Sequence, residues 1–556
     1  MAEQTKARET AWLQARELTP EKIKLAQQAL EEIRAGEKVF EAIRHNPLPD
    51  GYLSKNILVT VYRELVRRGE WENDPSLLAK IRMKPMRTLS GVTTVTVLTK
   101  PYPCPGDCIF CPTDQRMPKS YLPDEPGAMR ALHHGFDPYE QVAARLEALH
   151  AVGHPTDKIE LLILGGTWSS YRKDYQAWFL RRCLEAMNGI DSREPEPDHR
   201  QFPRVDYAAL EAAQTLNERA AHRNVGLVIE TRPDHVTTQE LAWLRRLGVT
   251  KVQMGAQSLD DHILEINKRG HTQEETHQAV ALLRAAGFKI VLHWMPNLLG
   301  ATLESDREDF SHLWDGLDPD EIKIYPTQLL ENADLYAYWQ RGEYQPYSTE
   351  QLVNLIADIK PTIPLYCRVN RVIRDIPSDN VVDGNKRTSL RQDVHRELKR
   401  RAQKCACIRC REVRGQQIST DQLQMDDLIY QTDHAEEHFI SWVTSDAHKP
   451  AARLVGYLRL SLPGHDSPET ELADLQGAAI IREVHIYGQS LQVGEEKEGA
   501  AQHAGLGTKL LEKADQIARE QGYERIAVIS AIGTRAYYLA RGFKRGDLYL
   551  VKDLTN

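Results

Sequence analysis

Long hydrophobic runs are absent from this 556-residue sequence, and no stretch is apolar enough to cross a membrane. The first residues, 1–14, lack the apolar core of a secretory signal peptide. An excess of positive charge is absent too, because 71 Lys and Arg face 79 Asp and Glu, for a formal net charge of −8. We therefore expect a cytoplasmic protein without a membrane partner, in which any nucleic-acid contact depends on a local basic surface.

Cysteine is scarce and unevenly placed. Of the eight cysteines, only Cys183 and Cys367 stand alone. The other six form two groups of three: Cys104, Cys108 and Cys111, then Cys405, Cys407 and Cys410. Clusters of this kind in a chain with no expected leader predict metal binding rather than disulfides.

The first group has the spacing C-x3-C-x2-C on a short loop with Pro105 and Gly106. Thiolates at this density select zinc, copper(I) or an iron–sulfur cluster. A four-iron cluster is normally held by four thiolates. Three would leave one iron open to a substrate or cofactor, and the neighbouring Phe110 could shield the cluster from water. The spacing alone also allows a structural zinc loop that takes its fourth ligand from elsewhere.

The length of the chain predicts roughly three or four domains. Residues 1–75 read as helices, because Thr19-Pro20 begins a run with apolar residues at helical spacing. Later changes in pattern divide the remainder. The expected parts are a helical N-terminal region (1–75), a strand–helix domain (76–364), a basic cysteine-containing linker (365–415) and a C-terminal α/β domain (416–556).

From about residue 90 strand and helix patterns alternate. The expected strands are 92–99, 159–164, 225–230, 249–254, 289–294 and 321–324. Six such units imply a parallel sheet with helices outside, and the C-terminal strand ends would carry the site. Gly165, Gly166 and Thr167 follow the second strand, and the cysteine loop follows the first. Both would therefore lie at the same rim of the sheet. Glu230, Arg232, Gln257 and Lys323 sit at later strand ends, where each could bind a ligand or form a structural ion pair.

The linker contains eleven Lys or Arg and three acids between Lys386 and Arg414. Such a run is either a solvated face or a phosphate-binding surface. Our candidates for phosphate contacts are Lys386, Arg387, Arg391, Arg396, Arg400 and Arg401. The run also holds the second cysteine group, C-x-C-x2-C, which predicts a zinc site that lacks one ligand. Cys367 and His395 are the nearest candidates for the fourth.

The C-terminal part changes pattern again. Segments 439–443 and 454–460 alternate like a hairpin, and 478–487 and 526–530 read as further strands. Between the last two, the sequence Gln502-His503-Ala504-Gly505-Leu506-Gly507-Thr508 opens an amphipathic helix at 510–521. Free N–H groups at such a helix start bind an anion. Of Tyr537 and Tyr538, we expect one to pack in the core and the other to reach a bound ligand.

These motifs carry a family resemblance. The cysteine loop followed by Gly165-Gly166-Thr167 resembles radical SAM enzymes, and the C-terminal part resembles GNAT acetyltransferases. Their combination resembles the Elongator catalytic-subunit family, in its prokaryotic stand-alone form. The further segments that carry this likeness are 157–160, 323–327, 482–488 and 533–538. The resemblance implies an α/β multidomain fold: a partial (β/α)6 radical SAM barrel, then a GNAT-type acetyltransferase domain, after a helical N-terminal region.

The resemblance also implies an activity, namely addition of a carboxymethyl group to carbon 5 of the wobble uridine of tRNA. The implied cofactors are a 4Fe-4S cluster on Cys104, Cys108 and Cys111, S-adenosylmethionine at Gly165–Thr167, acetyl-CoA, and a structural zinc. The implied acetyl-CoA contacts are Lys158, Glu483, Val484, His485, Ile486, Gly505, Leu506, Gly507, Thr508, Tyr537 and Tyr538. Of these, Lys158, Glu483, His485 and Tyr538 are the candidates for catalysis. The implied partners are the tRNA anticodon stem-loop, held by the basic run, and an electron donor. The short cluster loop and the lack of a long basic N-terminal extension imply action without accessory subunits.

In the implied reaction a radical made from S-adenosylmethionine takes hydrogen from the acetyl methyl, and the carbon radical adds to the base. Thioester hydrolysis, stimulated by tRNA, then leaves the carboxymethyl group. One alternative is a protein lysine acetyltransferase with a structural iron–sulfur domain, for which Glu483 is the obvious carboxylate base. Another is a non-enzymatic tRNA-binding scaffold, which would leave the cysteine triad and acetyl-CoA loop unexplained.

Overall fold

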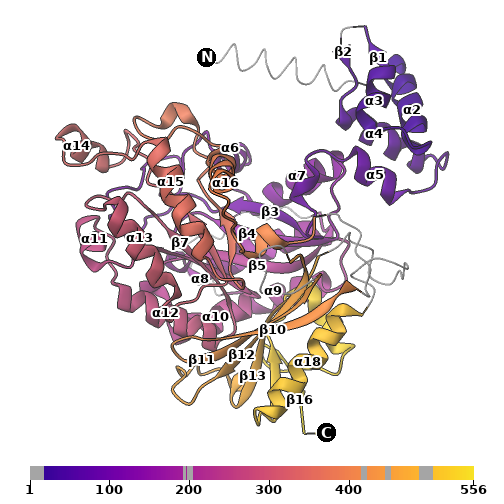
Figure 1. Ribbon diagram of the computed structural model, residues 1–556. Coiled ribbons are helices and arrows are strands. Elements are labelled where there is room, and N and C mark those ends of the chain that lie inside the picture. The colour runs from indigo at the N-terminus through magenta and orange to yellow at the C-terminus, as the bar shows by residue number, and fades with distance from the viewer. Residues whose placement is uncertain are drawn as a thin grey trace. The chain divides into compact units, whose positions relative to one another are not determined.

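The computed structural model describes residues 18–49, 51–191, 196, 205–414, 422–444, 452–487 and 505–555. It divides into two compact units, Met1–Thr93 with Ala143–Asp157, and Thr94–Val142 with Lys158–Asn556. Figure 1 shows the elements of both. No helix among the described residues has the length and apolarity to cross a membrane. The four domain boundaries expected from the sequence remain a prediction.

The first unit is mainly helical, as its apolar spacing predicts. Its elements are α2 (Pro20–Arg34), α3 (Val39–His45), α4 (Lys55–Arg67), α5 (Pro75–Ile81), the strand pair β1 (Pro47–Leu48) and β2 (Gly51–Tyr52), and the 3-10 turn η1 (Pro85–Arg87). Thr19 caps α2, because its side chain accepts a hydrogen bond from the Lys22 N–H. Leu30 and Ile33 from α2 and Leu58 and Tyr62 from α4 are buried in one core.

The second unit begins with a seven-stranded sheet whose strands follow one another in chain order. They are β3 (Thr93–Leu98), β4 (Lys158–Leu164), β5 (Arg223–Thr231), β6 (Lys251–Gln257), β7 (Lys289–Trp294), β8 (Glu321–Ile324) and β9 (Arg368–Arg371). All pairs from β4 to β9 are parallel. The six expected strands are confirmed. The seventh, β9, was missed because four residues with Arg at both ends show no apolar pattern.

Helices lie between these strands, as expected for a curled parallel sheet with its helices outside (Figure 1). They are α6 (Pro126–His133), α7 (Pro138–Ala151), α8 (Lys173–Asn188), α9 (Tyr207–Asn217), α10 (Thr238–Leu247), α11 (Asp261–Ile266), α12 (Gln273–Ala285), α13 (Leu303–Ser311), α14 (Leu335–Gln340) and α15 (Thr349–Ile359). Two more helices, α16 (Leu390–Arg400) and α17 (Ile408–Arg411), follow β9.

The C-terminal part forms a second, mixed sheet in the order β10-β11-β12-β13-β14-β16-β15. The strands are β10 (Gln424–Gln431), β11 (Ala435–Val443), β12 (Leu454–Pro463), β13 (Ala478–Ile486), β14 (Arg525–Val528), β15 (Lys544–Arg545) and β16 (Leu550–Asp553). The helix α18 (Leu506–Glu520) connects β13 to β14, and the short α19 (Arg535–Leu539) follows. The expected hairpin is confirmed as the antiparallel pair β11–β12.

Strand β13 is paired on both sides for only part of its length. It pairs with β14 in parallel from Ala478 to Ile481, whereas its pairing with β12 continues to Ile486. β13 and β14 therefore separate after Ile481. Helix α18 begins later in the chain, after β13 has ended. A β-bulge between Arg459 and Leu460 of β12 lies opposite the point where they separate.

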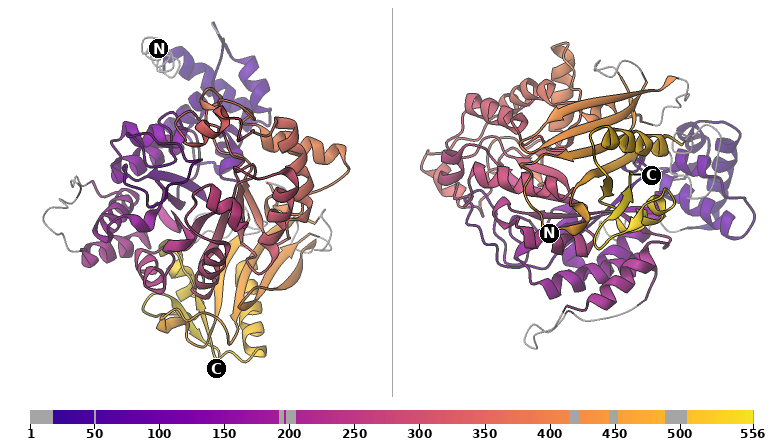
Figure 2. Two further views of the ribbon diagram at one scale, coloured as in Figure 1. Left: turned by 90° about the vertical axis from the view of Figure 1, so that its left-hand side faces the viewer. Right: turned by 90° about the horizontal axis from the view of Figure 1, so that it is seen from below.

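The mixed sheet packs against the N-terminal ends of the parallel strands (Figures 1 and 2). Lys289, the first residue of β7, lies 2.5 Å from Glu483 of β13. Arg368, the first residue of β9, donates a hydrogen bond to the Tyr487 hydroxyl at 2.9 Å. The cysteine loop follows the C-terminal end of β3. The two regions expected to do chemistry thus lie at opposite ends of the same short strands.

Candidate active site

The cysteine loop is anchored at its centre. The Ile109 N–H donates to the Asn267 carbonyl at 3.2 Å, and the Ile109 carbonyl accepts from the Leu335 N–H at 2.8 Å. Ile109 and Phe110 are buried in an apolar cluster. Cys108 is buried, whereas Cys104 and Cys111 are half-buried. The loop therefore presents three thiols from a fixed support, and Phe110 is buried in the same apolar cluster as Cys108.

Two arginines place positive charge beside these thiols. The Arg269 Nη1 lies 3.7 Å from the Cys108 Sγ. A hydrogen bond from Cys111 lowers the pKa of Cys108 most, and the charges of Arg269 and Arg232 lower it further against the effect of burial. A Cβ on Gly106 would lie 2.1 Å from the Arg232 Nη1, so only glycine allows this close approach. The surroundings therefore favour the thiolate form of Cys108, the form that binds metal, whereas the hydrogen bond with Cys108 and burial raise the pKa of Cys111.

The Gly165-Gly166-Thr167 turn lies against the start of the cysteine loop. Gly165 has φ +136°, and a Cβ there would lie 1.8 Å from the Thr99 Oγ1. The Thr167 Oγ1 is 4.0 Å from the Cys104 Sγ. The hydroxyl of Tyr171 lies 2.8 Å from the Thr99 Oγ1 and donates to the Lys100 carbonyl at 2.9 Å. Tyr171 thus connects the ends of β3 and β4, a role that the sequence did not signal.

Several buried polar atoms around this loop have no hydrogen-bond partner among the described residues. They are Arg232 Nη1, Gln257 Oε1, both ring nitrogens of His271, and Thr327 Oγ1. Gln257 is the last residue of β6, and Arg232 and Thr327 follow the C-terminal ends of β5 and β8. Gln257 also has a positive φ of 71°, which is uncommon for a non-glycine residue. Buried polar groups are normally paired, so this ring fits a polar ligand beside the cluster.

The other strand-end residues make pairs with each other. Lys323 lies 3.5 Å from Glu230, which also accepts a hydrogen bond from the Tyr121 hydroxyl at 2.9 Å. Arg232 pairs with Asp234 at 2.8 Å and still keeps Nη1 free. From the sequence, each of these residues could either bind a ligand or form a structural ion pair. The structure shows pairs for Glu230, Lys323 and Arg232.

At the other end of the strands, Glu483 is held by three groups. Lys289 lies 2.5 Å from its Oε1, Arg459 lies 3.1 Å from its Oε2, and the Tyr457 hydroxyl donates to Oε1 at 2.8 Å. Burial raises the pKa of Glu483, but Lys289 and Arg459 outweigh it and lower the pKa to about 2. A carboxylate with this pKa is a poor general base near neutral pH.

His485 lies two residues beyond Glu483 and packs against aromatic rings. Its ring centroid is 4.5 Å from that of Tyr487 and 5.9 Å from that of Tyr457. Burial lowers the pKa of His485 to about 4, so the ring is neutral near pH 7. Its Nε2 is buried and has no partner among the described residues. Lys158, the third residue predicted here, is the first residue of β4 at this same end.

The predicted pyrophosphate loop is described only from Gly505 onward. Gln502, His503 and Ala504 lie outside the described residues, as does Gly488. Gly505 has φ +70° and precedes α18, in which Leu506 and Gly507 are buried. A Cβ on Gly507 would lie 2.6 Å from the Tyr537 Oη. The Tyr537 hydroxyl therefore packs closely against this helix start, which is possible because residue 507 has no side chain.

One of the two adjacent tyrosines packs in the core, as the sequence predicts. Tyr538 is buried in the core under α18, and its ring stands at 87° to that of Tyr537. The guanidinium of Arg541 lies 3.6 Å from the Tyr537 ring centroid. Burial raises the pKa of Tyr538, and the charge of Glu483 raises it further, so this hydroxyl stays protonated. Which of the two reaches a ligand remains a prediction.

The second cysteine group closes into a compact site. The sulfurs of Cys405, Cys407 and Cys410 all lie within 4.8 Å of one another, and no other described residue joins them. Thiols this close can converge on one ion, whereas cysteines of a four-iron cluster each bind a separate iron. Hydrogen bonds from Cys405 and Cys410 lower the pKa of Cys407. Neither Cys367 nor His395 belongs to the group, so both stay open as the fourth ligand.

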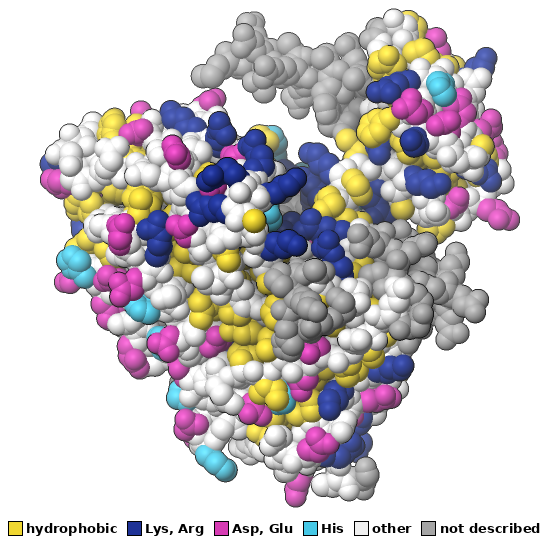
Figure 3. Space-filling model, viewed as in Figure 1, with side chains coloured by type: hydrophobic (Ala, Val, Ile, Leu, Met, Phe, Trp, Pro, Cys, Tyr) yellow, Lys and Arg dark blue, Asp and Glu magenta, His cyan; other side chains and the backbone are white. Residues whose placement is uncertain are grey.

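The basic run separates into exposed and structural residues. Lys386 is exposed, and the side chains of Arg387, Arg396 and Arg400 are 61 %, 76 % and 73 % exposed. Arg391 instead donates to the carbonyls of Val369 and Asn370, and Arg401 pairs with Asp358 at 2.6 Å. Figure 3 shows Lys and Arg side chains gathered over the region where Figure 1 places α16.

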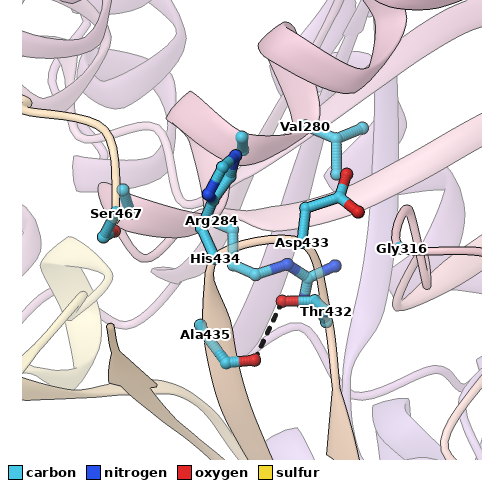
Figure 4. Close-up of a pocket in the computed structure, with 10 residues that line it drawn as sticks. Val280, Arg284, Gly316, Thr432, Asp433, His434, Ala435 and Ser467 are labelled. Carbon is cyan, nitrogen blue, oxygen red and sulfur yellow. Dashed lines mark hydrogen bonds between the residues drawn. The ribbon is translucent and has the colours of Figure 1, made fainter. Parts of the chain in front are cut away.

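A small hollow elsewhere contains none of the predicted site residues. It lies between α12 and the turn joining β10 to β11, and Figure 4 shows Arg284, Asp433 and His434 at its wall. Arg284 is already engaged, because its Nη2 donates to the Leu317 carbonyl at 2.7 Å and the Asp318 carbonyl at 2.9 Å. We assign no role to this hollow.

A cysteine triad after the first strand of a curled parallel sheet, bordered by a glycine turn and unpaired polar groups, defines a radical SAM protein. The Radical SAM superfamily model matches residues 102–313, and the Radical_SAM C-terminal domain model matches residues 319–400.

Comparison with individual proteins narrows the class. A tRNA uridine(34) acetyltransferase of Methanocaldococcus jannaschii is 39 % identical over 88 % of this chain and 90 % of its own. A protein of the same name from Dehalococcoides mccartyi is 41 % identical over 84 % of this chain and 99 % of its own. Human Elongator complex protein 3 is 33 % identical over 86 % and 87 %. This chain belongs to the family that these proteins form.

A solved structure agrees with this assignment. The archaeal Methanocaldococcus infernus Elp3 with an N-terminal deletion has a TM-score of 0.70 and 35 % identity to this chain. The match covers 83 % of this chain and 99 % of the other. The fold expected from the sequence, a radical SAM domain followed by a separate mixed-sheet domain, is confirmed.

Proposed function

We propose that this protein adds a carboxymethyl group to carbon 5 of uridine 34 in tRNA, using acetyl-CoA and S-adenosylmethionine. One observation carries the proposal. The chain has a cysteine triad at the C-terminal ends of the parallel strands, and strands β13 and β14 separate near the N-terminal ends of those strands. Its relatives named tRNA uridine(34) acetyltransferase match 88 % and 84 % of the chain.

The triad and the ring of unpaired polar atoms fit a 4Fe-4S cluster with S-adenosylmethionine. Cys104, Cys108 and Cys111 would hold three irons, and the Gly165–Thr167 turn would receive the methionine part of the cofactor. When bound, this pair supplies a radical able to remove hydrogen from the acetyl methyl. The residues around it orient the cofactor: Arg232 and Gln257 offer unpaired polar atoms, and Phe110 excludes water on one side.

Acetyl-CoA would bind where β13 leaves β14. The start of α18 offers backbone N–H groups to the pyrophosphate, and residues 482–486 border the pantetheine arm. The Tyr538 hydroxyl is protonated and can donate to the thioester oxygen. Lys158 and His485 complete the predicted site. The acetyl group, still joined to CoA as a thioester, would have to reach from the N-terminal toward the C-terminal ends of the parallel strands, about 13 Å from Lys289 to His293 along β7.

The geometry argues against the alternative of a protein lysine acetyltransferase with Glu483 as base. Glu483 is an ion-paired carboxylate with a pKa of about 2, bound to Lys289 of the other sheet. It therefore positions β13 against the parallel strands rather than accepting a proton.

The remaining partners follow from the surface and the second cysteine group. Lys386, Arg387, Arg396 and Arg400 would bind phosphates of the anticodon stem-loop, whereas Arg391 and Arg401 would stabilise the fold. Cys405, Cys407 and Cys410 would hold a structural Zn²⁺. An electron donor must supply the cluster. We place the reaction in the cytoplasm and expect it to need no accessory subunit.

Isotope transfer tests the proposal. We expect anaerobic incubation with tRNA, S-adenosylmethionine, reductant and acetyl-CoA trideuterated at its methyl to place deuterium in the 5′-deoxyadenosine product. Mass spectrometry would measure it, with unlabelled acetyl-CoA as the control. Formation of 5′-deoxyadenosine without deuterium would show that the acetyl methyl is not the hydrogen donor, and would overturn the proposed chemistry.

A further inference from the structure

Glu230 on β5 and Lys323 on β8 form a long ion pair on the inner face of the curled parallel sheet. The Lys323 Nζ lies 3.5 Å from the Glu230 Oε1, whereas charge-assisted hydrogen bonds are normally about 2.7–2.9 Å long. The two strands are separated by β6 and β7, so the pair spans the inside of the curl. The side chains are 15 % and 9 % exposed. Both charges are therefore largely buried, although neither is a close partner of the other.

Each member of the pair keeps hydrogen-bonding capacity. The Tyr121 hydroxyl donates to the Glu230 Oε2 at 2.9 Å and fixes the orientation of the carboxylate. The Glu230 Oε1 has only the long contact with Lys323 among the described residues. Lys323 donates no other hydrogen bond to any residue that the structure describes, and its Nζ lies 5.7 Å from the centroid of the Tyr325 ring. An acceptor oxygen and a donor nitrogen thus lie side by side, and a molecule with a complementary donor and acceptor can bind both.

The inner face of the sheet is less covered than its outer face. Glu160 of β4 lies 2.5 Å from Lys251 of β6, two strands away, which identifies the inner face of β4. On that face Leu162 and Leu164 are half-buried, whereas Ile163 between them points the other way and is buried. Protein interiors are normally close-packed, so partly exposed leucines on this face indicate space beside them. Because β4 pairs with β5, this surface adjoins the ion pair.

The ion pair lies one step along the strands from the cysteine loop. Glu230 and Arg232 point to the same side, because side chains alternate along β5 and Arg232 continues it with an extended backbone. A Cβ on Gly106 of the cysteine loop would lie 2.1 Å from the Arg232 Nη1. Two residues of a strand span about 7 Å, which separates Glu230 from Arg232 in the direction of the N-terminal strand ends. A nucleotide base held by Glu230 and Lys323 would thus lie between the proposed radical centre and the proposed acetyl-CoA site.

Uracil has the hydrogen-bonding pattern that fits this pair. Its N3–H is a donor flanked by two carbonyl oxygens, so a carboxylate can accept from N3 while an ammonium donates to a neighbouring oxygen. In cytosine N3 is an acceptor, which a carboxylate repels. A base of the wrong pattern would leave buried polar groups unpaired, and such sites discriminate strongly.

We propose that Glu230 and Lys323 recognise the uracil of nucleotide 34. Glu230 accepts the N3–H and Lys323 donates to an adjacent carbonyl oxygen, while Tyr121 positions the carboxylate. The base enters the interior of the sheet after it has left the stack of the anticodon loop. The inference deepens the proposed function, on which it rests, because it names the residues that select the substrate base.

The test compares tRNA carrying uridine 34 with tRNA carrying 3-methyluridine 34, which has a methyl group in place of the N3–H. Mass spectrometry of the carboxymethylated nucleosides would give kcat/KM for each substrate. We expect the unmutated protein to prefer uridine by about 100-fold. Asp375→Asn, which neutralises an exposed carboxylate paired with Arg371, is the matched control and should keep this preference.

Two variants of Glu230 separate charge from shape. Glu230→Gln keeps the shape and an acceptor oxygen but removes the charge, so kcat/KM for uridine should fall about tenfold. The value for 3-methyluridine should stay unchanged, because that base has no N3–H to donate. Glu230→Ala makes room for the methyl group and should bring the two substrates within about threefold of each other. If Glu230→Ala fails to fold, the result for Glu230→Gln decides the question alone.

The outcomes distinguish failure of the inference from failure of the proposed function. An unchanged preference in Glu230→Gln would overturn the inference and leave the proposed function intact. Loss of S-adenosylmethionine cleavage by Glu230→Gln in the absence of tRNA would assign Glu230 to the cofactor, and would overturn the inference too. Absence of 5-carboxymethyluridine with the unmutated protein would overturn the proposed function and the inference with it.

Discussion

At the scale of single residues, Glu483 shows how burial and pairing compete. Burial disfavours its charge, yet Lys289 and Arg459 keep it ionised with a pKa of about 2. The folded pKa is below the unfolded value of about 4.5, so Glu483 stabilises the fold above that pH. The stabilisation is lost as pH falls from about 4.5 toward 2.

The loss of stability at acid pH tests the ion pairs of Glu483 with Lys289 and Arg459. We expect Glu483→Gln to lose about 3 kcal/mol of unfolding free energy near pH 7, because Lys289 and Arg459 are left without their counter-charge. The loss should shrink as the pH approaches 2, where Glu483 itself becomes protonated. Urea unfolding at pH 7, 4 and 3 would measure it, with the exposed ion-paired Glu343→Gln as control. An equal loss at all three pH values would contradict the assignment of charge.

The sequence predicted the residues that belong to a recognisable motif. It missed residues whose role depends on contacts with distant parts of the chain. The spacing of the cysteines predicted both clusters. Tyr171 and Arg269 have no local signature, because each reaches its partners only after distant strands and turns come together. Arg401 shows the converse: it looked like the other arginines of its run, but Asp358 on α15 holds it.

At the scale of elements, the start of α18 depends on one glycine. We expect Gly507→Glu to abolish acetyl-CoA binding, because its Cβ would lie 2.6 Å from the Tyr537 Oη and its charge would face the pyrophosphate. Isothermal titration calorimetry would measure the affinity. Lys513→Glu, further along the same helix, changes the charge in the same direction and should bind acetyl-CoA within about threefold of the unmutated protein. Unchanged binding by Gly507→Glu would exclude this helix start as the pyrophosphate site.

Helix α16 and the turn before it make a second prediction. Replacing Arg387, Arg396 and Arg400 with Gln should weaken binding of every tRNA alike. The slope of log K against log salt should fall by about one for each phosphate that the variant no longer neutralises. Fluorescence anisotropy over a salt series would measure this. Arg341→Gln, an exposed arginine on another element, is the control. An unchanged slope would make the exposed face of α16 an ordinary solvated surface.

The elements themselves were predictable where their pattern is periodic. Six parallel strands and the β11–β12 hairpin follow from apolar runs, and α2 follows from its Thr19 cap. Strand β10 (QMDDLIYQ) was missed because it lies at the edge of its sheet and its apolar and polar residues do not alternate. Strand β9 was missed because it is a short edge strand that pairs only with β8 and has arginine at both ends.

At the scale of the whole molecule, the proposed function assigns the two reaction steps to opposite ends of the parallel strands. Acetyl-CoA would bind at their N-terminal ends, and hydrogen abstraction would take place at their C-terminal ends. We expect tRNA to stimulate acetyl-CoA hydrolysis, because an ungated site would waste the thioester. A triple Cys→Ala variant at Cys104, Cys108 and Cys111 should keep this tRNA-stimulated hydrolysis. Release of free CoA with and without tRNA would measure it, and equal rates in the unmutated protein would contradict gating.

The central claim is that one chain joins a radical centre and an acetyl-CoA site to modify uridine 34. The most direct measurement is mass spectrometry of nucleosides from tRNA incubated anaerobically with protein, reductant, acetyl-CoA and S-adenosylmethionine. The account predicts 5-carboxymethyluridine, absent when cytidine replaces uridine 34 and absent with the triple Cys→Ala variant. An acetylated nucleoside instead, or the same product from the triple variant, would contradict it.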